Sequence, residues 1–234
     1  WYCVTYCFLI CSVFCSDGPA VIYYYTILFV GSVICVSETE VTLTLLPKAF
    51  ARTSKTFAYF APKDNLLVVN SSSANKAEEL LGFLRNSIES LPVIPPNAKN
   101  IPSEVMTLWL QHQTAGENFE IDQECELYNP AEDGNVVRCK GQDLYSDEIQ
   151  THLAAGKQVK KLGVLWKDAL SCILEDDLTI KRLKFQDMVL EKADEADAES
   201  AAEQFDQDFA VMSLELSKFF KSLFKAFGGL QRKI

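Results

Sequence analysis

The chain has 234 residues, of which 48% are hydrophobic, and it carries a formal net charge of −10. This apolar content excludes a chain that is disordered throughout, and two His and eight scattered Cys residues leave little material for metal or acid–base chemistry. The net negative charge argues against nucleic-acid binding unless the positive charges are gathered on a surface of their own.

Residues 1–36 differ in composition from the rest of the chain. They hold a single charged residue, Asp17, and five of the eight Cys residues. The apolar run 19–36 is long enough to span a bilayer, but no Lys or Arg flanks it to set a topology. Three interpretations remain: a membrane hairpin, a buried pair of elements, or a segment that is not native coding sequence. We favour the third, because the composition changes abruptly near residue 37.

Residues 37–234 predict an α+β fold, with antiparallel sheets, packed helices and a long C-terminal helix. A short helix is expected within 38–50. Residues 56–62 and 66–72 predict a hairpin whose turn is Lys63-Asp64-Asn65. Ser73 is a suitable N-cap for the next helix, and Pro92 ends it.

The middle of the chain predicts further helices and strands. Pro102 is expected to begin a helix, and residues 118–122 and 135–140 are expected to form strands. In the second strand Arg138 and Lys140 share one face, because successive side chains alternate. A helix is expected from its cap at Ser146 to its end at Gly156.

Three strand-like runs follow, at 157–166, 169–176 and 178–185, and they predict an antiparallel meander. The alternation of apolar residues shifts within the last run, so we expect a bulge or a strong twist near Lys181. An acidic linker, 191–203, leads to a final helix whose apolar stripe runs from Phe205 to Phe227 and ends at Gly228-Gly229.

The sequence lacks the usual signatures of catalysis. It has no phosphate-binding loop, dinucleotide fingerprint, HExxH motif or paired CxxC motif. His112 and His152 stand alone, and Cys125, Cys139 and Cys172 are expected to be small core residues of a reduced, cytosolic protein. The chain is therefore predicted not to be an enzyme, and no cofactor or metal is expected.

The charges are distributed unevenly. Residues 101–137 hold eight acids and no Lys or Arg, and residues 187–211 hold nine acids and one Lys, so each block carries −8. The cations fall in short groups on outward strand faces or at the starts of elements: Lys48, Arg52 and Lys55; Arg138 and Lys140; Lys157, Lys160 and Lys161; Lys181, Arg182 and Lys184. If the sheet gathers them away from the acids, they form a surface that binds phosphates without reading sequence. The other interpretation is that all these charges only solubilise the chain.

Five long segments then decide between these interpretations. The stretches LLPKAFARTSKTFAYF (45–60), SANKAEELLGFLRNSIESLPVIP (73–95), DEIQTHLAAGKQVKKLGVLW (147–166), TIKRLKFQD (179–187) and FDQDFAVMSLELSKFFKSLFKAFGG (205–229) occur in order. Together they make the region from about 37 to 230 resemble the bacterial recombination-associated RdgC family.

The resemblance implies a cytoplasmic, nucleoid-associated protein that binds double-stranded DNA without sequence preference. Family members form a ring-shaped homodimer whose basic hole encircles the duplex, and they limit the access of the RecA recombinase to DNA. By this resemblance Lys48, Arg52 and Lys55 belong to the inner basic lining, Phe50 and Gln142 lie at subunit contacts, and the acidic blocks lie outside the ring.

This sequence also departs from the family. The N-terminal third of the family is replaced by residues 1–36, and Gly141 stands where a second lysine is usual. The alternative function is a membrane-anchored protein held by residues 19–36. A weaker alternative is a scaffold whose acidic linker mimics DNA.

Overall fold

The computed structural model describes residues 7–8, 45–50, 53–71, 73–88, 90–116, 118–131, 135–194 and 200–231. The chain divides into two compact units, Phe14–Lys55 and a larger unit that contains Trp1–Val13 and Thr56–Ile234. In the smaller unit the described part holds a short 3-10 helix, Leu46–Lys48, with Pro47 in its first turn. The expectations for residues 9–44, including the apolar run 19–36, fall outside the described residues.

A small antiparallel sheet carries the predicted hairpin. Strands β2 (Phe57–Ala61) and β3 (Leu66–Asn70) pair in register, and the two-residue strand β1 (Cys7–Phe8) pairs with the other edge of β3. Alternate residues of β3 serve two cores: Leu66 and Val68 join the main core, whereas Leu67 and Val69 pack against helix α2 (Ala74–Ile88). The hairpin prediction is thus confirmed.

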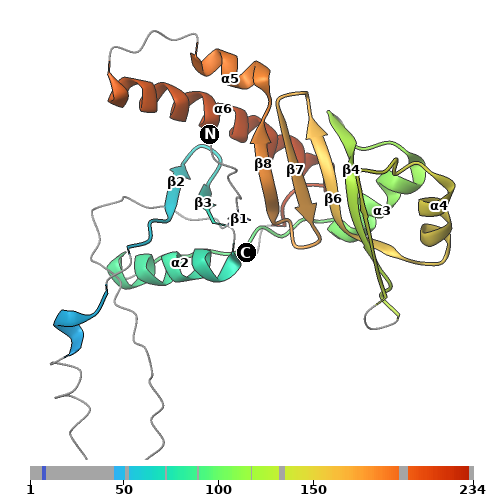
Figure 1. Cartoon of the computed structure of the whole chain (residues 1–234), viewed down its shortest axis with the longest axis horizontal. Coiled ribbons are helices and arrows are strands. Elements are labelled where there is room, and N and C mark those ends of the chain that lie inside the picture. Colours follow the sequence, from blue (N-terminus) through green and yellow to red (C-terminus); the bar gives the residue numbers. More distant parts are fainter. Residues whose placement is uncertain are drawn as a thin grey trace, which may run out of the picture. The chain divides into compact units, whose positions relative to one another are not determined.

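A second, five-stranded antiparallel sheet has the strand order β5-β4-β6-β7-β8 (Figure 1). Its strands are β4 (Phe119–Tyr128), β5 (Val136–Lys140), β6 (Gln158–Trp166), β7 (Leu170–Glu175) and β8 (Ile180–Phe185). The predicted meander forms three of them, and β4 is longer than the expected 118–122. The predicted bulge is present, since the β7–β8 register shifts after Ser171 and Arg182 has a φ of 50°.

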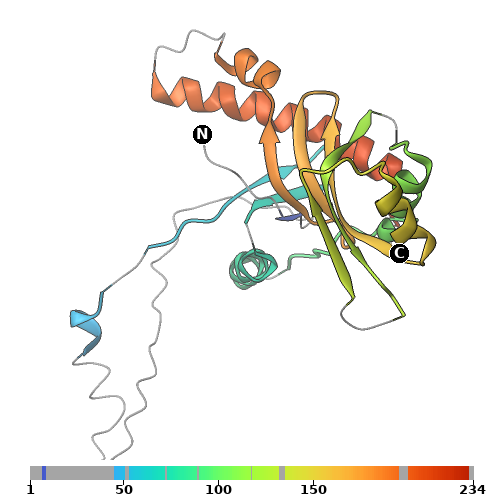
Figure 2. The ribbon, with the colours of Figure 1, turned by 45° about the vertical axis from the view of Figure 1, so that its right-hand side comes forward.

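The main core lies on one face of this sheet. Helices α3 (Pro102–His112), α4 (Asp147–Ala154) and α6 (Ala201–Ala226) contribute to it, and α6 runs behind the strands in both views (Figures 1 and 2). Phe219 is fully buried at its centre, with ring contacts to Phe119, Trp166 and Phe220. Cys125, Cys139 and Cys172 are buried free thiols, as expected.

Helix α6 is also tied to the small sheet through the hairpin turn. Ser217 Oγ donates to Asp64 Oδ2 at 2.5 Å, and Lys221 Nζ lies 3.0 Å from Asp64 Oδ1. Burial raises the pKa of Asp64, but the bonds from Ser217 and Lys221 outweigh it and hold that pKa below its usual value. The turn therefore fixes how the hairpin and α6 meet within the larger unit.

Three details of the sequence interpretation need correction. The expected acidic linker begins as a helix, α5 (Asp187–Asp194). Ser146 stands at the N-cap of α4, but its hydroxyl makes no hydrogen bond. The first half of the α6 stripe is open to solvent, with Phe205 66% and Phe209 37% exposed, because α6 begins before the part of the helix that the core covers.

Among the residues that the structure describes, no helix has the length and apolar character needed to cross a membrane.

We predict that Phe219→Ala lowers the free energy of unfolding by about 3–5 kcal/mol, because it leaves a cavity where three aromatic rings meet. Urea denaturation measures this change. Leu214→Ala is the control, since Leu214 lies on the same helix and is 61% exposed; it should change stability by less than about 0.5 kcal/mol. Equal effects of the two variants would contradict the assignment of the core.

Candidate nucleic-acid interface

The face of the five-stranded sheet opposite the core gathers six of the predicted cations. The strand register decides this, because Cys139, Leu162 and Leu183 are buried on the core side and their neighbours alternate to the other side. We call this side the outward face. Its cations are Arg138, Lys140, Lys161, Lys181, Arg182 and Lys184.

Five charged side chains form a row across this face, one from each strand. We call this set the charge row, and in spatial order it is Arg138, Glu126, Lys161, Glu175 and Lys181. The Nε of Arg138 donates to Glu126 at 2.9 Å, and Lys161 Nζ lies 3.5 Å from the same carboxylate. Glu175 lies 3.3 Å from Lys161 Nζ and 2.8 Å from Lys181 Nζ. Each carboxylate is thus shared by two cations.

The two carboxylates of the charge row are nearly buried, whereas their partners reach solvent. The Glu126 and Glu175 side chains are 11% and 10% exposed, against 76% for Arg138. Burial raises the pKa of Glu126, but the hydrogen bond from Arg138 and the charge of Lys161 outweigh it and hold that pKa below its usual value. Glu126 therefore stays ionised at neutral pH.

A further ion pair, Arg182 with Glu124, lies beside the charge row. It depends on an irregular stretch of β4, where the register to β6 shifts between Ile121 and Cys125. Gly163 permits this shape, because a Cβ there would lie 3.2 Å from the Glu124 carbonyl oxygen and 3.3 Å from the Asp122 Cβ. A larger residue at 163 would press on the backbone that places Glu124.

The expectation that cations and carboxylates occupy separate surfaces is wrong. The acidic block 101–137 supplies Glu124 and Glu126 to the outward face, and Glu175 joins them from β7. The reason is the two-residue period of β4, which places the acids at 120, 122, 124 and 126 on one side of the strand. That alternation was visible in the sequence and was the signal for this pairing.

The remaining predicted cations of the larger unit are not held by ion pairs with described residues. Lys140 and Lys184 are exposed on the two outer strands, and neither forms an ion pair with a described residue. Lys157 and Lys160 lie at the start of β6, half-buried. Lys160 lies near Asp176. Burial and the charge of Asp177 raise the pKa of Asp176 above its usual value, and the charge of Lys160 offsets this only in part. Among the predicted cations of the larger unit, these four lysines form no ion pair with a carboxylate of the described residues.

Three of the four predicted site residues of the smaller unit are described, Lys48, Phe50 and Lys55, and all three are exposed. Arg52 falls outside the described residues. Phe50 is fully exposed, at 103%. In the larger unit Gln142 is half-buried and donates through Nε2 to Glu148 Oε2 at 3.0 Å, and the adjacent Gly141 has a φ of +66°.

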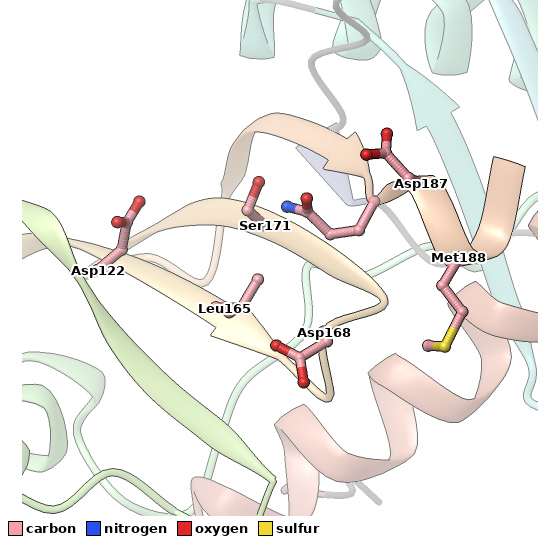
Figure 3. Close-up of a pocket in the computed structure, with 7 residues that line it drawn as sticks. Asp122, Leu165, Asp168, Ser171, Asp187 and Met188 are labelled. Atoms are coloured by element: carbon pink, nitrogen blue, oxygen red, sulfur yellow. The ribbon is translucent and has the colours of Figure 1, made fainter.

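A hollow of about 470 Å³ opens at the end of the outward face next to the β6–β7 turn (Figure 3). The side chains that line it include Asp122 from β4, Asp168 from the turn and Asp187 from the start of α5. Three carboxylates make this end unfavourable for a phosphate. Within the described ranges, no group of three or more His, Cys, Asp or Glu residues is arranged to hold a metal ion.

Comparison with known proteins identifies the family. Residues 38–230 match the family model described as "Putative exonuclease, RdgC". This chain belongs to the RdgC family. Similar relatives are named recombination-associated protein RdgC: the Aeromonas hydrophila protein is 47% identical over 83% of this chain, and that of Pseudomonas paraeruginosa is 48% identical over 81%. The Pseudomonas syringae pv. syringae protein is 47% identical over 81%.

The chain spans a little under two thirds of the length of these RdgC relatives, 64% of the Aeromonas protein and 62% of the others. The two kinds of name also differ, since the family description names an exonuclease and the relatives are named for recombination.

We predict that Glu126→Gln makes the free energy of unfolding fall less steeply in acid. The native pKa of Glu126 is depressed, so its contribution is fully present above the ordinary value of 4.5 and is lost as the pH falls through the lower native value. Urea denaturation between about pH 5 and pH 3 measures this. Glu79→Gln is the control, because Glu79 is exposed on α2. If the free energy of unfolding of both variants fell equally steeply with falling pH, the role of the charge row would be contradicted.

Proposed function

We propose that this chain is part of a recombination-associated protein that binds double-stranded DNA through its phosphates, without reading the base sequence. The observation that carries the proposal is that a member of the RdgC family presents six cations on one exposed sheet face. Phosphate contacts position a protein on the duplex but carry no sequence information directly.

The composition of the outward face sets the strength of this binding. Five carboxylates share the face with the six cations: Glu120, Asp122, Glu124, Glu126 and Glu175. Charge that is already compensated releases few counterions when a phosphate arrives. One copy of the face therefore binds weakly, and the uncompensated lysines dominate the contact.

Weak binding by one face favours a proposal in which two copies act together. We propose a homodimer that surrounds the duplex, in which Lys48, Arg52 and Lys55 add to the inner lining. Phe50 is suited to a subunit contact, because a fully exposed aromatic ring gains apolar burial when a partner covers it. Two linked faces raise the apparent affinity without any new kind of contact.

In the cell, a nucleoid-associated protein of this kind would occupy duplex DNA and limit the access of the RecA recombinase. This role requires occupancy and not bond cleavage, so we propose a non-enzymatic binding protein. A nuclease assay with Mg²⁺ or Mn²⁺ on a labelled duplex tests that part, and metal-dependent degradation of the duplex would contradict it.

We predict that the affinity for a duplex of about 20 base pairs falls linearly with salt on a double-logarithmic plot, with a slope of about −0.9 for each phosphate neutralised. Because two lysines of the outward face, Lys140 and Lys184, form no ion pair with a described residue, we expect a slope of about −2 for each copy of the face. Fluorescence anisotropy at several salt concentrations measures it.

The matched control is a second duplex of the same length and unrelated sequence, which should bind with about the same affinity because phosphates are common to both. An affinity that does not change with salt would contradict phosphate binding, and a strong preference for one sequence would contradict the absence of base reading.

A further inference from the structure

Glu126 and Glu175 are unusual among the carboxylates of the outward face because each is nearly buried and each touches two cations. They lie on strands separated only by β6, so they are about 10 Å apart across the sheet. Both therefore sit among the groups that a phosphate would have to approach.

The cations of the charge row remain reachable from solvent despite this pairing. The Arg138, Lys161 and Lys181 side chains are 76%, 34% and 40% exposed. A phosphate can thus contact their outer edges, but the carboxylates beneath them have already compensated most of their charge. The pairing is geometric and not incidental, because neighbouring strands place each carboxylate between two cations.

We propose that Glu126 and Glu175 are built-in competitors of phosphate that limit how strongly the outward face binds DNA. They act through Arg138, Lys161 and Lys181 and are positioning residues, since they are not themselves DNA contacts. This inference rests on the proposed function and adds to it which cations the carboxylates prevent from contributing fully to phosphate binding. In the unmodified chain the contact is then made mainly by Lys140 and Lys184, which no carboxylate of the described residues holds.

A substitution of either carboxylate by Gln, which removes its charge and keeps its shape, should therefore strengthen the binding of duplex DNA. In Glu175→Gln, Lys161 keeps Glu126 as a partner, but Lys181 loses its only ion pair among the described residues. In Glu126→Gln, Arg138 is released in the same way. Each substitution should therefore free about one cation for phosphate, which steepens the salt slope by about 0.9.

A suitable control exists on α6. Glu215 has a 14% exposed side chain and pairs with Lys218 Nζ at 2.8 Å. Glu215→Gln removes the same charge from a similarly buried, ion-paired carboxylate on a helix that packs on the core side of the sheet. It separates a local effect on the outward face from a general effect of net charge.

The experiment measures anisotropy of a fluorescein-labelled 20-base-pair duplex with the full chain and the three variants, between about 50 and 200 mM salt. We expect Glu175→Gln and Glu126→Gln to bind more tightly at low salt. Over this range their affinity should fall about three- to fourfold more than that of the unmodified chain, whereas Glu215→Gln should match the unmodified chain. Urea denaturation of each variant verifies that it is folded. If Glu126→Gln is unfolded, the comparison of Glu175→Gln with the unmodified chain tests the inference.

The failures are distinguishable. If the unmodified chain binds in a salt-dependent manner but Glu175→Gln has the same slope as Glu215→Gln, the inference is overturned and the proposed function stands. If the unmodified chain does not bind and Glu175→Gln does, the inference is supported in a stronger form. If no version of the chain binds the duplex, both proposals fail together.

Discussion

The alternation of side chains along the five-stranded sheet is the constraint on which the rest of this structure depends. One side of each strand must fill the core beneath α3 and α6, so the other side receives most of the charged residues that the strands carry. Cations and carboxylates from distant parts of the chain therefore meet on one surface. The charge row is a consequence of register, and its order across β5, β4, β6, β7 and β8 is set by strand pairing alone.

This arrangement links stability and function in opposite directions. The shared carboxylates bind the cations of neighbouring strands together, and Glu126 and Glu175 hold Arg138, Lys161 and Lys181 in a fixed line. The same contacts reduce the charge that an incoming phosphate meets. Under the proposed function, a protein that holds a duplex without choosing a sequence would gain from such moderation, since binding that is too strong would prevent its displacement.

Much of the fold was predictable, because it is encoded locally. The β2–β3 hairpin, the Pro102 helix start, the β6–β8 meander and the bulge at Arg182 all follow from periodicity and turn residues. The charge pairing was not predicted, because Glu126 and Lys161 lie 35 positions apart in the chain and meet only when the sheet forms, although the alternating acids of β4 were a signal. The exposure of Phe205 was also missed, since the spacing of apolar residues along α6 does not show which part of the helix the core covers.

The most direct test of the central claim is to map which lysines the duplex covers. Acetylation of the full chain with and without a 20-base-pair duplex, followed by mass spectrometry, reports the accessibility of each amine. If the outward face is the phosphate-binding surface, Lys140 and Lys184 lose reactivity when DNA binds, and Lys76, exposed on α2, keeps it. Unchanged reactivity of Lys140 and Lys184 in a chain that demonstrably holds the duplex would contradict the account.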